Sequence, residues 1–524
     1  MSAREPQDRL VSRRWFVERM AWVSAVAAGS AGLPAGAAGA DRRAGAGEAR
    51  ARIGRGLRDV AVRPGVQQDP TEMTLAETVA LVRRGLVRPE EVVEAHVDRI
   101  ERFDGALKAY ADRPTRGALL AEVGRTPSDG PDAALRGVCL APKDNFYTAD
   151  LLTEGGSLVY RGFRPDYDAT AVSSMRAAGG LVVGKAQMGN LAGGRAQVYG
   201  TTTPTTRNAW SPDDDAYSPG GSSSGTATAV AARLAVAGLG TQTGGSVIGP
   251  GNRQGLTCIK PTFGRVSLHG VIPLSYTRDH VGSMARDALD AAILLQVIAH
   301  PDPNDPRTLG LPPAPDFVRA ATPFPGESPA VRWPTRVGVW PGYLEQDDGA
   351  VNALRRTLVE RLVRTGNVTV VGEVSLPDQW DELTGSPLGG SHGDPTAFFI
   401  EALRRDVRDF GDRLPRFLNG MLQSADTYVK VQQARMLLLH RMQTQLFSQC
   451  DVVLTEGTGP FDGTGLPVLG MPIGVQTDEG TGLTVPVGAT LAARPFAEER
   501  LFAVAAAWQA VTDHHRRRPP DPSV

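Results

Sequence analysis

Residues 219–246, PGGSSSGTATAVAARLAVAGLGTQTGGS, contain two clusters of glycine and serine separated by an apolar stretch. The first cluster is Pro219–Gly225 and the second is Gly240–Ser246. Runs of glycine let backbone N–H groups turn toward one point without obstruction by side chains, so each cluster can hold a serine hydroxyl among amides. A flexible loop or a phosphate-binding loop is the alternative. Because neither cluster has the Gly-Lys-Ser/Thr order of a P-loop, nucleotide binding is disfavoured.

A serine nucleophile needs a base that takes its proton, and the choice lies between histidine and lysine. The eight histidines are poorly placed for that task, which disfavours a histidine-based triad. His269 and His280 follow the second cluster, and a structural or substrate-side role is expected for both. Lys143 follows the apolar run 138–142 and so stands at the end of a predicted buried strand. A desolvated lysine loses roughly three to five pKa units and becomes a base near neutral pH, although a lysine taken alone is more often on the surface.

Helical and strand patterns alternate on both sides of these clusters. The capping box Thr74-Leu75-Ala76-Glu77 predicts one helix, and Pro89 followed by two acids predicts a second. Further strands are predicted at Leu181–Val183, Val236–Leu239, Arg336–Trp340, Val368–Val371, Asp451–Thr455 and Leu483–Thr490. Further helices are predicted at Ala171–Ala178, Ala229–Ala235, Ala285–His300, Val351–Arg364, Ala425–Phe447 and Phe496–Asp513. This alternation favours an α/β fold with a mostly buried central sheet.

Composition bounds the possible partners. The 524 residues are 41% apolar and 22% charged with a formal net charge of −1, so neither nucleic acid nor an anionic membrane is indicated as a partner. The three cysteines, Cys139, Cys258 and Cys450, form no CxxC pair and are expected to be buried, small apolar residues. The sequence contains no cluster of His, Cys and Asp with metal-ligand spacing, so no metal or organic cofactor is expected.

The N-terminus has the features of an export signal. Arg13-Arg14 is followed by Trp15 and Phe16, then by a weakly apolar stretch over 20–38 with Ala-x-Ala sites near its end. This order is typical of a signal peptide, and the arginine pair indicates the twin-arginine route to the periplasm or the extracellular space. A disordered basic terminus is the alternative. No later segment is a better candidate for a membrane span.

Four segments are therefore expected: a signal peptide (1–40), a flexible linker (41–72), one large catalytic domain (73–513) and a polar C-terminal tail (514–524). The patterns leave a monomer and a homodimer equally open.

The order of these motifs resembles the amidase signature family, which uses a Ser–cis-Ser–Lys triad. The strongest match is the core from Gly220 to Ser246, where Ser222 and Ser246 lie 24 positions apart as in the family. The resemblance runs from about Thr74 to Thr512 and implies a single domain with a central mixed β-sheet covered by helices on both faces. Supporting matches are Gly137–Asn145, Gly184-Lys185, Arg207-Asn208, Lys260–Ser267, Asp279–Gly282, Thr464–Pro467 and Arg494–Phe496.

The resemblance also implies a role for each triad residue. Ser246 is expected to be the nucleophile, Ser222 a bridging serine after a cis peptide bond, and Lys143 the base that draws the proton through Ser222. The expected oxyanion hole is formed by four backbone N–H groups, those of Thr243, Gly244, Gly245 and Ser246. Asp144 and Asn145 are expected to order the lysine loop, and Gln242 departs from the more common Asp.

Amide hydrolysis of a small-molecule substrate is the function that this resemblance implies, with linear amides preferred over peptide bonds. Two alternatives remain. One is a catalytically weak binding protein on the same scaffold, and the other is a subunit resembling the amidase component of tRNA-dependent amidotransferases, which the export signal disfavours. The acyl pocket is placed between Leu383 and Met421, where Phe398, Phe399 and Phe410 are expected to pack in the core rather than to line a cleft.

Overall fold

A computed structural model of the chain describes residues 60–128, 130, 133–322, 329–345, 349–385 and 393–523. The predicted signal peptide lies outside the described residues, as does most of the predicted linker.

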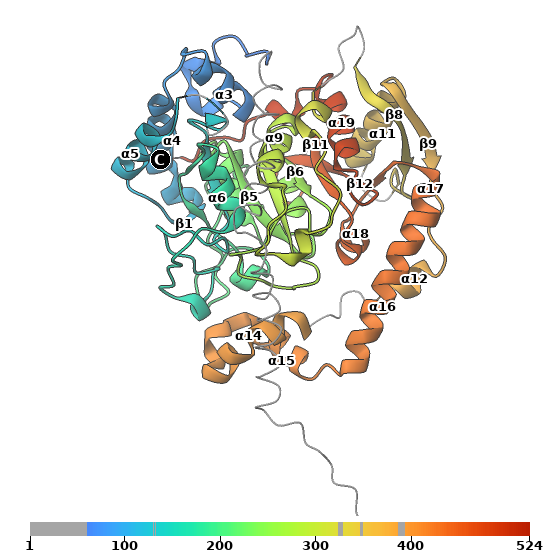
Figure 1. The fold of residues 1–524 in the computed structure, drawn as a ribbon. Helices are drawn as coiled ribbons and strands as arrows, with labels where there is room; N and C mark the ends of the chain where they lie inside the picture. Colours follow the sequence, from blue (N-terminus) through green and yellow to red (C-terminus); the bar gives the residue numbers. More distant parts are fainter. Residues whose placement is uncertain are drawn as a thin grey trace, which may run out of the picture. The chain divides into compact units, whose positions relative to one another are not determined.

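The strands are β1 (Tyr110–Asp112), β2 (Cys139–Pro142), β3 (Leu181–Val182), β4 (Lys185–Ala186), β5 (Ala237–Gln242), β6 (Thr257–Lys260), β7 (His280–Ala285), β8 (Ala330–Val339), β9 (Gly366–Glu373), β10 (Val452–Thr455), β11 (Val468–Thr477) and β12 (Thr484–Ala493). Within the described ranges, ten of them form one sheet in the order β3-β2-β5-β7-β6-β11-β12-β10-β8-β9 (Figure 1). The margins of this sheet are parallel, whereas the strands from β5 to β10 pair antiparallel. Strands β1 and β4 form a separate small pair.

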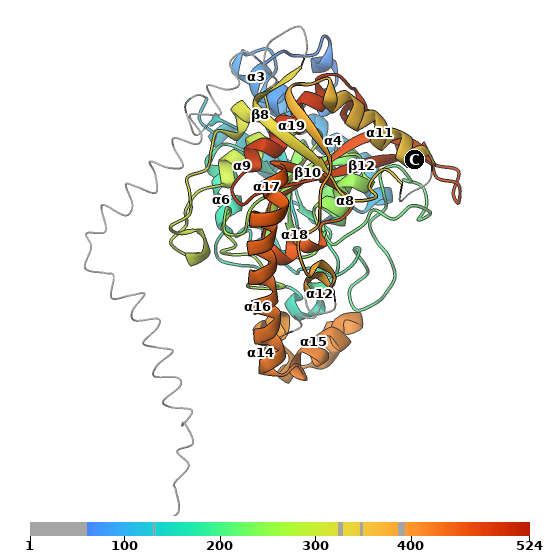
Figure 2. The ribbon, with the colours of Figure 1, turned by 90° about the vertical axis from the view of Figure 1, so that its right-hand side faces the viewer.

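The helices are α3 (Leu75–Arg83), α4 (Pro89–Leu107), α5 (Arg116–Arg125), α6 (Thr170–Ala177), α7 (Ser224–Ala231), α8 (Ile248–Arg253), α9 (Ala288–Ile298), α10 (Phe317–Ala320), α11 (Gly349–Val363), α12 (Trp380–Thr384), α14 (Gly393–Arg405), α15 (Leu414–Met421), α16 (Ala425–Arg441), α17 (Phe447–Gln449), α18 (Gly459–Thr464) and α19 (Glu498–Gln509). The predicted capping box at Thr74 and Glu77 is present at the start of α3. Helix α16 continues through a π-helical turn into α17, and Figure 2 shows this long helix reaching from the sheet to α14 and α15.

Helices cover both faces of the sheet, as β5 and β7 show. A Cβ on Gly238 would lie 2.6 Å from Thr226 of α7, so even-numbered positions of β5 face α7. Leu239 is paired with Ser283 of β7, whose hydroxyl donates to the carbonyl of Ala291 in α9. The two helices therefore cover opposite faces. The predicted fold, an α/β domain with a mixed central sheet between helices, is confirmed.

A second, smaller apolar cluster lies beneath α14 and α15. Its fully buried members are Leu191, Ile272, Phe399, Leu403, Phe410 and Phe417. Phe399 and Phe410 thus pack in a core, as expected, whereas Phe398 is 57% exposed. The cluster packs α14 and α15 against the loops that contain Leu191 and Ile272. The same loops contact the candidate active site described in the next subsection.

Three strands of the sheet, β6, β7 and β11, are absent from the predicted elements, and the sequences of β7 and β11 explain why those two are not predicted. Strand β7 begins with His280 and contains Gly282 and Ser283, which have low strand propensity. Strand β11 contains Pro472, which normally argues against a central strand, and its register shifts between Pro472 and Gly474. The predicted helix from Ala285 begins later, at Ala288, because Ala285 closes β7.

The packed body extends beyond the predicted domain boundaries at both ends. Arg63, inside the predicted linker, forms an ion pair with Glu77 at 2.7 Å. In the predicted C-terminal tail, His515 is buried and Arg518 lies 3.3 Å from Glu72. The two ends therefore pack together on the domain.

In the part of the chain that the structure describes, none of the helices combines the length and the apolarity that a membrane span requires.

Candidate active site

Lys143 directly follows the carboxyl end of β2. Its backbone N–H donates to the carbonyl of Leu239 in β5 at 2.9 Å, which extends the pairing of β2 with β5 by one residue. The side chain is fully buried. The apolar residues of β2 pack in the main core, so the chain leaves the strand with Lys143 already below the surface.

Ser222 accepts a hydrogen bond from this lysine. Lys143 Nζ lies 2.7 Å from Ser222 Oγ, and the peptide bond between Gly221 and Ser222 is cis, as the resemblance implies. The Ser222 carbonyl accepts from the N–H of Gly189 at 3.1 Å. Gly221 has no room for a side chain, because a Cβ there would lie 2.0 Å from the carbonyl oxygen of Gly194.

Thr241 of β5 is a further partner of the lysine. Its Oγ1 accepts from Lys143 Nζ and from Asn145 Nδ2, both at 3.0 Å. The second of these bonds connects Asn145 to the lysine through one shared hydroxyl. Asn145 therefore helps to order the lysine loop, whereas Asp144 pairs with Lys185 instead.

Burial lowers the pKa of Lys143 to about 7, and the charge of Asp279 partly opposes this shift. Lys185 and Lys260 are also fully buried, yet each has a carboxylate partner. Lys185 lies 3.4 Å from Asp144, and Lys260 lies 3.7 Å from Asp462. Among the described residues no carboxylate forms an ion pair with Lys143, so little stabilises its protonated form.

Ser246 occupies the loop between β5 and α8 and is half-buried. Its carbonyl accepts from the N–H of Ser223 at 3.3 Å, which brings the two serine clusters together. The Ser246 hydroxyl forms no hydrogen bond with another described residue, so the donation from Ser246 to Ser222 Oγ that a relay requires is not seen in the structure.

Four backbone N–H groups of this loop are the predicted oxyanion donors. One of them donates to a protein acceptor, and the other three have no acceptor among the described residues. The Gly245 N–H donates to Asp462 Oδ2 at 2.8 Å, and Gly245 adopts a φ of +82°. The N–H groups of Thr243, Gly244 and Ser246 have no acceptor among the described residues. Of the four predicted oxyanion donors, the Gly245 N–H is therefore already bound to the carboxylate of Asp462.

Gln242 and Asp462 hold the base of the loop. Gln242 Oε1 accepts from the N–H groups of Val247 and Ile248 at 2.8 and 3.0 Å, and its Nε2 donates to Asp462 Oδ1 at 2.7 Å. Gln242 therefore binds Asp462 without placing a second negative charge beside it. Asp462, in α18, has no local sequence signal that predicts this contact.

Comparisons with known proteins identify the family of this chain. The family model described as amidase matches residues 91–455. A putative amidase, AmiD, from Mycobacterium bovis is 32% identical over 493 residues, which cover 88% of this chain and 99% of that protein. The chain belongs to the amidase family.

Other relatives of this amidase family member have names that describe different activities. A subunit of glutamyl-tRNA(Gln) amidotransferase from Myxococcus xanthus is 32% identical over 502 residues, covering 86% of this chain and 99% of that protein. The solved structure of native peptide amidase from Stenotrophomonas maltophilia matches with a TM-score of 0.69 at 27% identity, covering 86% of this chain and 98% of that one. Family and relatives together support hydrolysis of amide bonds.

The two histidines that follow the second serine cluster, His269 and His280, have protein contacts of their own. His280 is buried, its Nδ1 lies 3.3 Å from the Gln242 carbonyl, and burial lowers its pKa well below the usual value. His269 stacks on Tyr167 with ring centroids 5.2 Å apart. Groups of His, Cys, Asp and Glu with the arrangement of a metal site are absent from the described ranges, and the three cysteines are buried.

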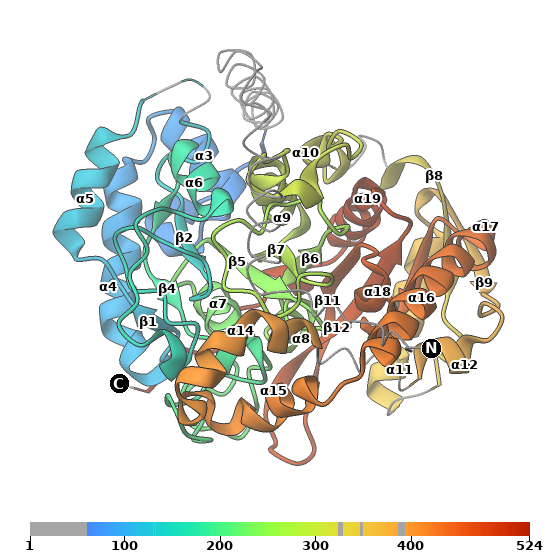
Figure 3. The same cartoon turned by 60° about the horizontal axis from the view of Figure 1, so that its bottom comes forward.

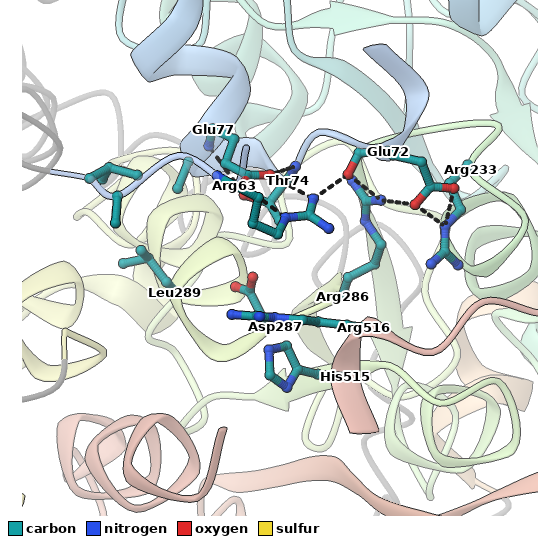
Figure 4. Close-up of a pocket in the computed structure, with 13 residues that line it drawn as sticks. Arg63, Glu72, Thr74, Glu77, Arg233, Arg286, Asp287, Leu289, His515 and Arg516 are labelled. Carbon is teal, nitrogen blue, oxygen red and sulfur yellow. Dashed lines mark hydrogen bonds and ion pairs between the residues drawn. The ribbon is translucent and has the colours of Figure 1, made fainter. Parts of the chain in front are cut away.

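A polar cavity of about 130 Å³ lies elsewhere in the domain (Figure 4). Arg286 and Asp287, which line it, directly follow Ala285 of β7. In the antiparallel pair, Ala285 is opposite Ala237, at the far end of β5 from Gln242. This cavity is therefore separated from the serine clusters by the length of the strand, and its walls are occupied by ion pairs such as that of Arg63 with Glu77.

Proposed function

We propose that this protein is an exported amidase that cleaves carbon–nitrogen amide bonds through an acyl-enzyme on Ser246, with Ser222 and Lys143 as its proton relay. The observation that carries the proposal is the contact of 2.7 Å between Ser222 Oγ and a buried lysine that has no carboxylate partner in the described chain. With a pKa of about 7, roughly half of the Lys143 side chains are neutral at pH 7 and can accept a proton.

In the proposed reaction, neutral Lys143 takes a proton from Ser222 while Ser222 takes the proton of Ser246. Ser246 Oγ then bonds to the carbonyl carbon of the amide, and the carbonyl oxygen becomes negatively charged. The relay returns the proton to the amide nitrogen, the C–N bond breaks and the amine leaves. Water attacks the acyl-enzyme by the same route and releases the acid. The relay requires the half-buried Ser246 hydroxyl to come within hydrogen-bonding distance of Ser222 Oγ.

The amides of Thr243, Gly244 and Ser246 are the proposed donors to the developing oxyanion. They have no protein acceptor among the described residues, in contrast to Gly245, whose N–H is held by Asp462. One such donor commonly contributes about 10²–10³ in rate. The proposed role of Asp462 is therefore to hold the loop after β5 in place, not to contact the substrate.

The test of this function does not need the substrate. Purified protein that begins at residue 41 is treated with a fluorophosphonate probe, and the adduct is mapped by peptide mass spectrometry. Labelling is expected at Ser246, and it should fall at least 100-fold in Lys143→Ala and in Ser222→Ala. Lys430→Ala is the matched control, because Lys430 is exposed and pairs only with Asp426 at 3.3 Å. A folded protein without labelling would favour the weak binding protein instead.

Export is proposed on the arginine pair and the apolar stretch that follows it. Replacing Arg13 and Arg14 with Lys is expected to leave the protein in the cytoplasm of the producing cells, whereas the unaltered chain reaches the periplasm or the medium. Cell fractionation with an antibody to the mature domain measures this. Equal export of both chains would contradict the twin-arginine assignment.

The relatives that belong to amidotransferases favour a second candidate, an amidase component of a larger assembly. That role requires partner proteins in the cytosol, so export argues against it. Linear amides are the proposed substrates, and a parallel assay of a linear amide and a capped dipeptide tests that preference. Size-exclusion chromatography with light scattering decides between monomer and homodimer.

A further inference from the structure

Two arginines at the start of α15, Arg413 and Arg416, are half-buried, and the acids whose charges reach them, Asp412 and Asp279, form no ion pair with either of them in the described chain. Their Nε atoms are shielded from solvent without a hydrogen-bond partner, and neither guanidinium has an ion pair in the ranges that the structure describes. By contrast, Arg408 pairs with Asp406 at 2.6 Å, and Arg435 donates to Thr277. Because a buried charge without a partner is costly, the two unsatisfied guanidiniums indicate a site for an anion.

The first of them lies beside the Ser222 loop. A Cβ on Gly193 would lie 2.0 Å from Arg413 Cζ, so the guanidinium rests directly on the Gly193 backbone. The next residue, Gly194, places its carbonyl oxygen 2.0 Å from where a Cβ on Gly221 would stand. The adjacent backbones of Gly193 and Gly194 thus approach Arg413 on one side and Gly221, which precedes Ser222, on the other.

The second arginine, Arg416, is linked through a chain of packing contacts and hydrogen bonds to the residues around Lys143. Phe417, which follows Arg416, is buried in the apolar cluster that contains Ile272. The N–H of Ile272 donates to the Asn145 carbonyl at 2.8 Å, and Asn145 shares the Thr241 hydroxyl with Lys143. Figure 3 shows α14 and α15 in front of α7 and α8, the helices that begin just after Ser222 and Ser246.

Electrostatics support an excess of positive charge here. The pKa of Arg416 is lowered by burial and then by the neighbouring charges of Arg413 and Arg278, with Asp279 acting in the opposite direction. Asp279 is already engaged, because its carboxylate accepts from the Thr243 hydroxyl and from the N–H groups of Leu274 and Ser275. Asp279 therefore holds residues next to the loop of Ser246, and in the described chain it forms no ion pair with Arg413 or Arg416.

We propose that Arg413 and Arg416 bind a carboxylate of the substrate, so that this enzyme acts on amides that carry a free acid group close to the scissile bond. The inference rests on the proposed amidase function. A guanidinium matches a carboxylate with two parallel hydrogen bonds, and the planar fork fixes its orientation as well as its charge. The carboxylate would neutralise the cluster and hold the amide near Ser246.

Two pairs of substrates, alike in size, test which side of the amide carries the acid. The first pair is the p-nitroanilide of glutaric acid and its terminal carboxamide analogue. The second pair is N-butyryl-4-aminobenzoate and N-butyryl-4-aminobenzamide. In at least one pair the acid is expected to have a kcat/KM at least tenfold higher than its neutral partner, with aniline release as the measure.

Variants assign that preference to the arginines. Arg413→Gln and Arg416→Gln are each expected to lower kcat/KM for the acid about 10- to 100-fold and to leave the neutral partner unchanged. Arg416→Lys should recover part of the loss. Arg408→Gln, on the preceding turn and 87% exposed, is the matched control and should leave both substrates unchanged. Equal rates for acid and neutral partners in both pairs, or an equal loss for both in the variants, would overturn the proposal.

Binding separates this proposal from the proposed function. Calorimetry on Ser246→Ala with glutarate and with N-butyryl-4-aminobenzoate measures recognition without turnover, and the probe measures the nucleophile. Binding that requires Arg413 and Arg416 without any Ser246 labelling would remove the enzyme assignment alone. Labelling of Ser246 that neither acid prevents, with no heat of binding, would remove the carboxylate site alone.

Discussion

Three buried lysines in one domain show what distinguishes Lys143. Lys185 and Lys260 each have an aspartate within 4 Å, whereas Lys143 has only hydroxyl and carbonyl oxygens. Burial lowers the pKa of all three, to about 7 in Lys143 and to about 8 in Lys260. The absence of a carboxylate partner favours the neutral form of Lys143, which its proposed role as a base requires, whereas the aspartates beside Lys185 and Lys260 favour their charged forms.

Thr241→Val tests how the base is positioned. Valine keeps the shape of threonine but removes the oxygen that binds Lys143 and Asn145. The rate of Ser246 labelling is expected to fall about tenfold or more because the lysine amine loses its orientation toward Ser222. A fall in labelling with a midpoint of thermal unfolding close to the parent supports this. An unchanged labelling rate would show that Ser222 alone positions the lysine.

The sequence predicts part of the site at this scale. The apolar run before Lys143 indicates a buried strand end, and the family resemblance points to Ser222 and Ser246. Thr241 and Asp462 are not predictable as partners, because the contact of Gln242 with Asp462 joins residues 220 positions apart. Pairings of that kind are decided by the packing of the sheet and leave no local pattern.

At the scale of the element, the loop after β5 depends on one contact from α18. Asp462 accepts from both Gln242 Nε2 and Gly245 N–H, so each of its two oxygens has a donor. The charge of Lys260, 3.7 Å away, balances the carboxylate. The unusual glutamine is thus explained: an aspartate or glutamate in its place would face a second carboxylate.

A pair of substitutions tests this arrangement. Gln242→Glu opposes Asp462 with a like charge, and Asp462→Asn leaves two amide groups facing each other, so each single variant is expected to slow Ser246 labelling about 10- to 100-fold. The double variant restores a donor–acceptor match, since the new amide at position 462 donates to the new carboxylate at position 242 and still accepts from Gly245. Labelling should recover to within a few-fold of the parent. A double variant no better than the worse single variant would refute the contact.

The strands that the sequence does not predict share a cause. Strands β7 and β11 lie in the middle of the sheet, where burial on both faces permits glycine and proline that an isolated strand would not tolerate. Helices with amphipathic spacing, such as α4, are predictable because their pattern is local. The sheet order is not, because it depends on which buried faces fit together.

At the scale of the whole domain, the two ends of the described chain are joined. Arg99 pairs with Asp521, Arg518 lies near Glu72, and the N–H of Ser523 donates to Asp213 at 2.7 Å. His514 stacks on Trp508 of α19. The C-terminal residues thus fasten the first helices to the core.

Removing residues 514–524 is expected to lower the free energy of unfolding by about 1–3 kcal/mol, since each exposed ion pair contributes little but the buried His515 and several hydrogen bonds are lost together. Denaturant unfolding measures this. Ser246 labelling should stay unchanged, because these residues are not part of its loop. Unaltered stability would show that the terminal contacts are incidental.

The account depends most directly on a neutral Lys143 that activates Ser246. The measurement is the rate of Ser246 labelling by the fluorophosphonate probe from pH 5.5 to 9, in the parent and in Lys143→Ala. Because burial lowers the lysine pKa to about 7, the deprotonated form increases with pH, and the parent rate should rise about tenfold per unit below pH 7 and level off above about 8. The variant should be slow and nearly independent of pH. A parent rate that does not change with pH, or the same profile in Lys143→Ala, would contradict the account.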